Sequence, residues 1–338
     1  MKNENQRGKE MKTIRFGGMV VLAMVLLFSF SVQAQEKYPN KPINLLVGFA
    51  AGGATDISAR ALGKAMEKIT SQPVAVVNKP GGGTSIQLHS VKTSPPDGYT
   101  LGVLATGGIV GPHLRDVPYE LFKDFTHLCQ FVAFPTGIAV HVDAPWKTLK
   151  EFVEYAQKNP GKLKYASTEP GSSSMMLAEQ FAAINQFKWV HVSHPGDSAA
   201  ATSLLGKHVD ALVLTPLGWG PFAKAGKFRV LGVFVEQRLK EFPNVPTVKE
   251  QGFKYYENAA ITAIYGILAP KGIPDAVHQA LLPVLRKAWQ DPEFQTVVEK
   301  NSLIPVYREG EEWVQYVKDW DKEAVRVMKQ IGMKGVRD

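Results

Sequence analysis

The sequence predicts an α/β fold of two domains. Short apolar strands alternate with helical segments, turns rich in glycine and serine follow the strands, and 338 residues suffice for two domains of roughly 150 residues. With 45% hydrophobic residues, 30 Gly and 22 Pro, the composition is that of a globular chain with a sizeable core. It excludes collagen-like, coiled-coil and disordered proteins.

The first predicted unit is a strand, a turn and a helix. Ile43–Phe49 is almost continuously apolar, as expected for a strand of a parallel sheet buried on both faces. Ala50–Ala54 is a turn of small residues, and Thr55 or Asp56 can cap the helix that follows. Asp56 and Arg60 stand four residues apart, so we expect them to pair on this helix.

The same unit recurs along the chain. Strands joined through helices predict mainly parallel sheets. The Gly- and Ser-rich loops then lie at the carboxyl edge, where open α/β folds bind ligands, and helix N-termini there offer unpaired N–H groups to an anion. The further predicted strands are Val74–Val77, Tyr99–Leu104, Leu163–Ala166, Trp189–Val192, Ala211–Leu214 and Phe228–Val233.

The last part of the chain is predicted to be helical. Aromatic and aliphatic residues form one stripe on its last helix, which we interpret as core packing rather than as a cofactor site. The predicted helices are Asp275–Gln290, Pro292–Asn301 and Glu311–Gly332, and the stripe consists of Trp313, Tyr316, Val317 and Trp320.

Residues 1–34 have the features of a secretory signal peptide. A basic start precedes the apolar run Met19–Phe30, which is shorter than the ~20 residues of a spanning helix, and small residues precede a cut after Ala34. The alternative is an uncleaved membrane anchor. We therefore expect a periplasmic protein. Its net positive charge is scattered, which argues against a nucleic-acid partner.

Several kinds of chemistry are absent from the sequence. The single cysteine, Cys129, excludes an internal disulfide and a thiolate zinc cluster, and the eight histidines are dispersed. The sequence has no P-loop, no GxGxxG after the first strand, no GxSxG and no HExxH. We expect no metal and no cofactor.

Eight segments, in order along the chain, resemble the substrate-binding component of tripartite tricarboxylate transporters, the Bug or TctC-like family. The resemblance runs from Tyr38 to Gly332. The segments are YPNKPINLLVGFAAGGATDISAR (38–60), VNKPGGGTSI (77–86), PDGYTLGV (96–103), GKLKYASTEPGSSS (161–174), HPGDSAAATSLLGKHVDALV (194–213), GKFRVLGV (226–233), FPNVPTVKEQGF (242–253) and YGILAPKGIP (265–274).

This resemblance implies a fold and a function. The fold is that of a type II-like periplasmic binding protein, with two α/β lobes, a central ligand cleft and two crossovers, near residues 134–142 and 258–267. Lobe one is expected to comprise residues 38–137 plus 262–338, and lobe two residues 138–261. Members capture small carboxylates and deliver them to a membrane permease. The resemblance therefore implies a monomeric binding protein and not an enzyme.

The resemblance also implies the ligand-binding residues. Each has an alternative role as a helix cap or tight-turn residue. For Asp56, pairing with Arg60 is preferred over ligand contact, because like charges repel. Lobe one contributes Phe49, Ala51, Gly52, Gly53, Ala54, Thr55, Asp56, Gly82, Gly83, Thr84, Ser85, Thr106 and Gly107, and lobe two contributes Ser167, Ser172, Ser173, Ser174, His194, Gly196 and Thr215.

Lobe two departs from the family pattern in the direction of apolar residues. Pro195 stands where the family often has Lys, Met175 where it often has His, and Val213-Leu214 where it often has Phe-Asp. We therefore expect a ligand with an apolar or aromatic body and one or two carboxylates, for which citrate is a poor substitute.

Two other functions remain open at this point. The chain is also compatible with a ligand-presenting subunit of a membrane sensor. A secreted serine hydrolase could use Ser172–Ser174 with His194 and Asp210, although such residues occur in any chain of this length. A hydrolase would turn over an ester, whereas a binding protein would only be stabilised by its ligand.

Overall fold

The computed structural model describes residues 38–168, 171–255, 263–330, 332–333 and 335–337, so the predicted signal peptide lies outside the described residues. No helix within these ranges is both long and apolar enough to cross a membrane. The helices are α2 (Ala54–Thr70), α3 (Ser85–Lys92), α4 (Thr106–Leu114), α5 (Leu149–Lys158), α6 (Ser173–Ile184), α7 (Asp197–Leu205), α8 (Pro216–Lys224), α9 (Asp275–Gln290), α10 (Pro292–Lys300) and α11 (Gly310–Gln330), with a 3-10 turn at Gly82–Thr84.

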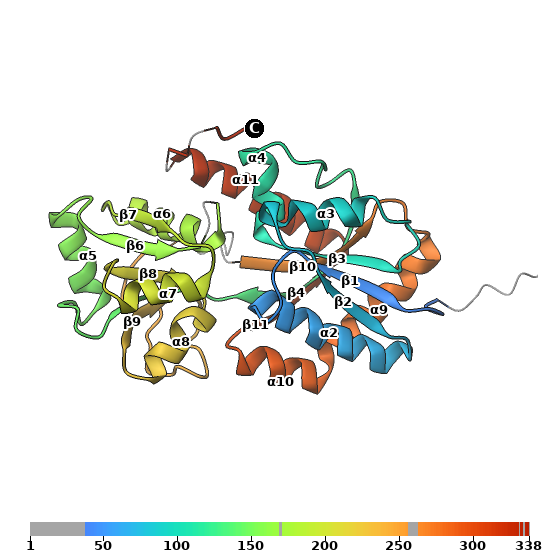
Figure 1. Ribbon diagram of the computed structural model, residues 1–338, viewed down its shortest axis with the longest axis horizontal. Coiled ribbons are helices and arrows are strands. Elements are labelled where there is room, and N and C mark those ends of the chain that lie inside the picture. Colours follow the sequence, from blue (N-terminus) through green and yellow to red (C-terminus); the bar gives the residue numbers. More distant parts are fainter. Residues whose placement is uncertain (1–37, 169–170, 256–262, 331, 334, 338) are drawn as a thin grey trace, which may run out of the picture. The chain divides into compact units, whose positions relative to one another are not determined.

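The strands form two separate sheets (Figure 1). Sheet A has the order β11-β4-β10-β3-β1-β2, and sheet B has the order β7-β6-β8-β5-β9. The strands of sheet A are β1 (Ile43–Val47), β2 (Val74–Asn78), β3 (Thr100–Leu104), β4 (Phe125–Phe134), β10 (Ala263–Pro270) and β11 (Ile304–Glu309). Those of sheet B are β5 (Gly137–His141), β6 (Lys164–Ser167), β7 (Val190–Ser193), β8 (Ala211–Leu214) and β9 (Phe228–Val233).

The expectation of mainly parallel sheets is wrong, because both sheets are mixed. Of the nine strand pairings in the described residues, five are antiparallel. The reason lies in the crossovers. Strand β4 leaves sheet A for sheet B, and β10 re-enters sheet A between β4 and β3, so β10 runs against both neighbours.

The crossovers lie at the carboxyl edges of both sheets. Phe134, at the end of β4, is opposite Ala263 at the start of β10. Gly137, at the start of β5, is opposite Leu214 and Val233, the last residues of β8 and β9. The loops that follow the parallel strands therefore lie at the same edges as the connections between the sheets.

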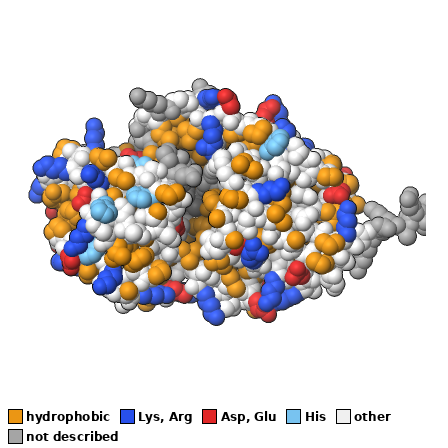
Figure 2. Space-filling view, viewed as in Figure 1, with side chains coloured by type: hydrophobic (Ala, Val, Ile, Leu, Met, Phe, Trp, Pro, Cys, Tyr) orange, Lys and Arg blue, Asp and Glu red, His pale blue; other side chains and the backbone are white. Residues whose placement is uncertain are grey.

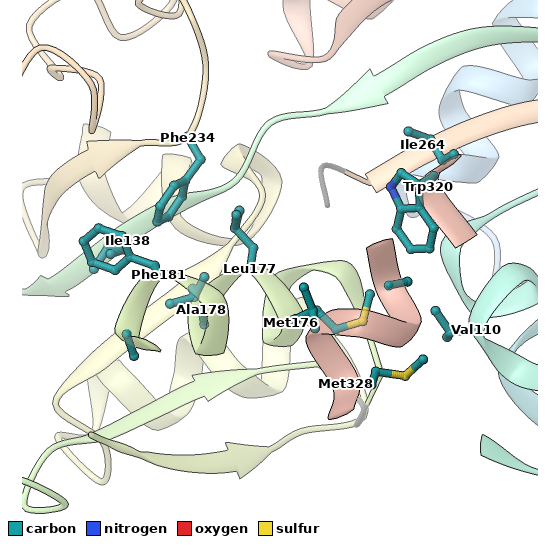
Figure 3. Packing of buried hydrophobic residues seen from close by; sticks show 14 of the residues in the cluster. Val110, Ile138, Met176, Leu177, Ala178, Phe181, Phe234, Ile264, Trp320 and Met328 are labelled. Atoms are coloured by element: carbon teal, nitrogen blue, oxygen red, sulfur yellow. The ribbon is translucent and has the colours of Figure 1, made fainter. Parts of the chain in front are cut away.

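One hydrophobic cluster includes residues of both sheets. It contains Leu46 and Ile264 of sheet A and Ile138 of sheet B. Helix α11 packs on β4 and also contacts α6, where the Gln180 amide donates to Glu323 at 3.4 Å. Figure 3 shows part of this cluster, including Met176 of α6 and Trp320 and Met328 of α11.

The stripe predicted on the last helix lies mainly in the core. Trp313, Val317 and Trp320 are buried, as predicted, while Tyr316 is only partly buried. Trp313 packs against Gly266 of β10, where a Cβ atom would lie 2.2 Å from the indole Cζ2 and 2.7 Å from the carbonyl oxygen of Cys129. Strand β10 therefore needs glycine at this point.

We predict that Gly266→Ala destabilises the fold. The added methyl group must displace Trp313 or the backbone of β4, which costs about 1–3 kcal/mol of unfolding free energy. Gly63→Ala is the matched control, because a Cβ there meets only valine side chains, at 3.3 Å or more, and alanine favours the helix. Equal urea midpoints for the two variants would contradict this assignment.

Candidate functional site

The first loop, between β1 and α2, is fixed by the carboxylate of Asp56. Its Oδ2 accepts the Gly52 N–H at 2.9 Å and Arg60 Nε at 3.0 Å, and its Oδ1 accepts Asn78 Nδ2 at 2.9 Å. The same Asn78 amide nitrogen donates to the Phe49 carbonyl at 3.0 Å. The predicted pairing of Asp56 with Arg60 is confirmed.

The predicted cap of this helix is wrong. Helix α2 begins at Ala54 with Gly53 as its N-cap, and no side chain caps it. Asp56 is in the first turn and reaches back to the loop instead. Burial would raise the pKa of Asp56, but its hydrogen bonds from Arg60, Gly52 and Asn78 outweigh burial and hold the pKa below its ordinary value. Its acceptor atoms are thus already used within the protein.

Tyr265 of β10 is a site residue that the sequence analysis missed. It is 8% exposed, and its ring stacks on Phe134 at 4.0 Å between centroids, with Phe49 at 6.4 Å. The pKa of Tyr265 is raised to about 12, mainly by burial. A hydrogen bond with the Thr55 side chain lowers this pKa, and the charge of Asp197 raises it. The hydroxyl group of Tyr265 is thus linked to Thr55 of α2, and the charge of Asp197 in α7 acts on it.

The second loop holds Thr84 in a strained conformation. Gly81, Gly82, Gly83 and Thr84 have φ angles of 121°, 57°, 55° and 74°, which favour glycine. A β-branched residue at such a φ costs roughly 1–3 kcal/mol, and strain of this kind is concentrated at functional sites. Arg115, after α4, supports the loop by donating to the Gly82 carbonyl at 2.9 Å.

Thr84 lies between the first loop and the first turn of α4. A Cβ on Gly48 would lie 2.8 Å from the Thr84 Cβ, and a Cβ on Gly108 would lie 3.2 Å from its Oγ1. Thr84 and Thr106 are 1% and 4% exposed, and neither Oγ1 has a hydrogen-bond partner among the residues that the structure describes. The Oγ1 atom of Thr136, in the β4–β5 crossover, is likewise buried without a partner in the described residues. The sequence analysis did not assign Thr136 to the site.

In sheet B, several of the predicted residues have partners within the protein. Ser172 caps α6 by accepting the Met175 N–H at 3.2 Å. The Ser167 hydroxyl group lies 2.8 Å from His191 Nε2, and burial lowers the pKa of that histidine. His194 Nδ1 donates to the Val192 carbonyl at 2.9 Å.

The remaining predicted residues surround the starts of the helices. In the first loop, Ala51, Gly52 and Gly53 are exposed and Ala54 is partly buried. Ser173 and Ser174 are buried in the first turn of α6. The other predicted residues are Ser85, the first residue of α3; Gly107, in the first turn of α4, where a Cβ would meet the Gly83 carbonyl at 2.9 Å; Gly196, the N-cap of α7; and Thr215, the N-cap of α8.

Asp197 is a further residue that the sequence analysis did not single out. It is the first residue of α7, and its Oδ2 accepts the Thr215 hydroxyl group of the next loop at 3.1 Å. Its charge also raises the pKa of Tyr265 in β10.

A cavity of about 450 Å³ lies apart from these loops. It is lined by the chain after β9 (234–241), by residues 302–306 and by Gln130, Arg308 and Tyr316, and none of the predicted residues lines it. Its charged groups are paired, as with Lys240 and Glu299 at 2.7 Å. The unpaired hydroxyl groups lie at the loops, which we therefore regard as the candidate site.

The residues proposed for a serine hydrolase are not joined into a catalytic set. Within the described part of the chain, no hydrogen bond links His194 to Ser172, Ser173 or Ser174. The carboxylate of Asp210 accepts the Lys164 N–H at 2.8 Å instead.

We predict that Asp56→Asn lowers the unfolding free energy by about 1–2 kcal/mol at pH 7, because it removes charge-assisted hydrogen bonds that hold the first loop. The pKa of Asp56 is lowered in the folded state, so its contribution is present above the ordinary carboxyl pKa and lost as the pH falls through the folded value. Urea unfolding should thus show the difference from wild type shrinking below about pH 4.

Asp143→Asn is the control for this prediction. Its carboxylate is 65% exposed in a pair with Lys207, so its loss should change stability less than the loss of Asp56 does. A loss for Asp56→Asn that is no larger than this, or that does not depend on pH, would contradict the role assigned to Asp56.

Comparisons with known proteins place the chain in a family. The family described as "Tripartite tricarboxylate transporter family receptor", TctC, matches residues 58–333. A UPF0065 protein from the gbd 5′ region of Cupriavidus necator is 32% identical, over 94% of this chain and 96% of that protein. Protein BugT of Bordetella pertussis is 26% identical, over 88% and 92% of the two chains.

Solved structures are similar over nearly their whole length. A periplasmic transporter is 31% identical with a TM-score of 0.76, covering 88% of this chain and 99% of the other. The periplasmic binding protein BugD is 29% identical with a TM-score of 0.75, covering 87% and 99%. These neighbours confirm the predicted fold of two α/β lobes. The chain belongs to the TctC family of tripartite tricarboxylate transporter receptors, which are solute-binding proteins and not enzymes.

Proposed function

We propose that this receptor captures a small carboxylate at the carboxyl edges of its two sheets and delivers it to the membrane permease of a tripartite tricarboxylate transporter. The observation that carries the proposal is the pair of buried hydroxyl groups of Thr84 and Thr106, which have no partner in the described residues. A buried polar group without a partner is costly, and a bound carboxylate would accept from both.

The chemistry of the loops suits a carboxylate. Helices α2, α3 and α4 begin at the edge of sheet A, and α6, α7 and α8 begin at the edge of sheet B. The N–H groups of their first turns, which have no partner within the helix, therefore lie at these edges. A hydrogen bond to a charged group contributes roughly 1.5–3 kcal/mol. Four to six such bonds, less the ordering costs, reach the ~8 kcal/mol of a micromolar complex.

The roles of the predicted residues differ within this proposal. Thr84, Thr106, Ser173 and Ser174 contact the carboxylate together with the main-chain N–H groups of the loops. Asp56 and Ser172 position their loops, in accordance with the hydrogen bonds they already make. Phe49 and Tyr265 provide the apolar part of the site.

The domain division and the location of the protein belong to the same proposal. Lobe one comprises 38–137 plus 262–338 and lobe two 138–261, which is supported by the distribution of the strands between sheets A and B. The receptor is a periplasmic monomer without a cofactor, exported by its signal peptide at 1–34. The names of the two similar periplasmic structures support this location.

We predict that Thr84→Val weakens carboxylate binding about ten- to hundredfold without destabilising the fold. Valine has the shape and the β-branching of threonine, and the lost hydroxyl group has no partner in the described part of the chain. Isothermal calorimetry measures the affinity and thermal denaturation the stability.

Thr202→Val is the control for this prediction. Its hydroxyl group donates within α7, to the Ser198 carbonyl at 2.9 Å, in an exposed position. It should leave binding unchanged. Equal affinities of wild type and Thr84→Val would refute the assignment of Thr84 to the site.

We also predict that carboxylates with an apolar or aromatic body bind more tightly than citrate. Phe49, Phe134 and Tyr265 form an aromatic group at the site, and the charge of Asp197 opposes a trianion. A thermal-shift screen at equal concentrations measures the order. Stronger stabilisation by citrate than by every aromatic or aliphatic monocarboxylate would contradict it.

A further inference from the structure

The carboxylate of Asp197 lies where helices α7 and α8 begin, at the carboxyl edge of sheet B. It accepts the Thr215 hydroxyl group at 3.1 Å, and a Cβ on Gly218 of α8 would lie 3.3 Å from the Asp197 Cβ. The charge of Asp197 also raises the pKa of Tyr265 in β10. Through Thr215, the N-cap of α8, Asp197 therefore belongs to the candidate site.

No positive group compensates this carboxylate. Within the described ranges of the chain, no Lys, Arg or His forms an ion pair with Asp197, and the Thr215 hydroxyl group is its hydrogen-bond donor. Burial raises the pKa of Asp197 because it disfavours the charged form. The side chain is partly buried, and a charge partly withdrawn from water without a counter-ion is costly, so its presence beside the candidate site requires an explanation.

The simplest explanation is that Asp197 only stabilises the N-terminus of α7. A carboxylate in the first turn does so through the helix dipole, and Asp275 at the start of α9 is an example in an exposed position. That effect does not require burial. It also does not explain why the carboxylate of Asp197 accepts the Thr215 hydroxyl group of the neighbouring loop.

We propose that Asp197 recognises a protonated amine, so that the solute is a small carboxylate that also carries an ammonium group. This inference rests on the proposed receptor function and specifies its ligand class. The ligand's carboxylate binds at Thr84 and Thr106, its ammonium group pairs with Asp197, and its apolar body lies against Phe49 and Tyr265. The ammonium group supplies the positive charge that the protein lacks at this point.

The test uses pairs of acids that share a carbon skeleton and differ in one amino group, such as L-phenylalanine with 3-phenylpropanoate and L-glutamate with glutarate. Calorimetry compares wild type, Asp197→Asn and the control Asp275→Asn. In at least one pair, wild type should bind the amino member at least tenfold more tightly. Asp197→Asn should lower the affinity for that amino acid at least tenfold but leave the affinity for the amine-free acid unchanged. Asp275→Asn should have the affinities of wild type.

The stability of the ligand-free protein is a second readout. Asp197→Asn should melt at the same temperature as wild type or higher, because it removes an uncompensated charge. A decrease as large as that of Asp275→Asn would assign Asp197 to the helix end alone and overturn the proposal.

Two binding results would also overturn it: equal or tighter binding of the amine-free member in every pair, or a preference for the amino member that survives in Asp197→Asn. If wild type binds no carboxylate of either kind, the receptor proposal fails and this inference fails with it.

Discussion

The arrangement of the site depends on the direction in which the chain crosses between its sheets. Strand β4 leaves sheet A at the carboxyl edge, and β10 returns at the same edge, because Phe134 and Ala263 are paired. Sheet B is entered and left at its own carboxyl edge, through Gly137 and Val233. The helix N-termini of both sheets therefore lie at the same edges as the crossovers. A crossover at the opposite edge of either sheet would separate them.

Within that arrangement, the polar groups fall into two kinds. Asp56, Ser172 and Ser167 have partners in the protein, so they fix the loops in place. Thr84, Thr106 and Asp197 lack the partner that their chemistry calls for. The groups with partners hold the loops in place, so the groups without partners cannot move to form hydrogen bonds within the protein. A binding site retains unused hydrogen-bonding groups in this way.

Local patterns in the sequence were sufficient for the elements that depend on them. Helix α9 and strands β8 and β9 have the predicted bounds, and the pair of Asp56 and Arg60 is set by helical spacing. Tyr265 could not be found in this way, because it meets Thr55 only after a crossover through the second sheet. Asp197 looks like an ordinary first-turn acid until Thr215 is placed beside it. The antiparallel strands were missed because nothing local marks the direction in which β10 returns.

The C-terminal helix has a mechanical consequence. Helix α11 packs on β4 of one sheet and contacts α6 of the other through Gln180 and Glu323, with Trp320 and Met328 in the same cluster as Met176 (Figure 3). On the face drawn in Figure 2, by contrast, charged side chains are scattered among hydrophobic ones, so the buried contacts of α11 are distinct from this mixed surface. Any rotation of one sheet relative to the other must therefore disrupt these buried apolar contacts as well as bend the two crossovers. Helix α11 is therefore the element whose packing resists such a rotation.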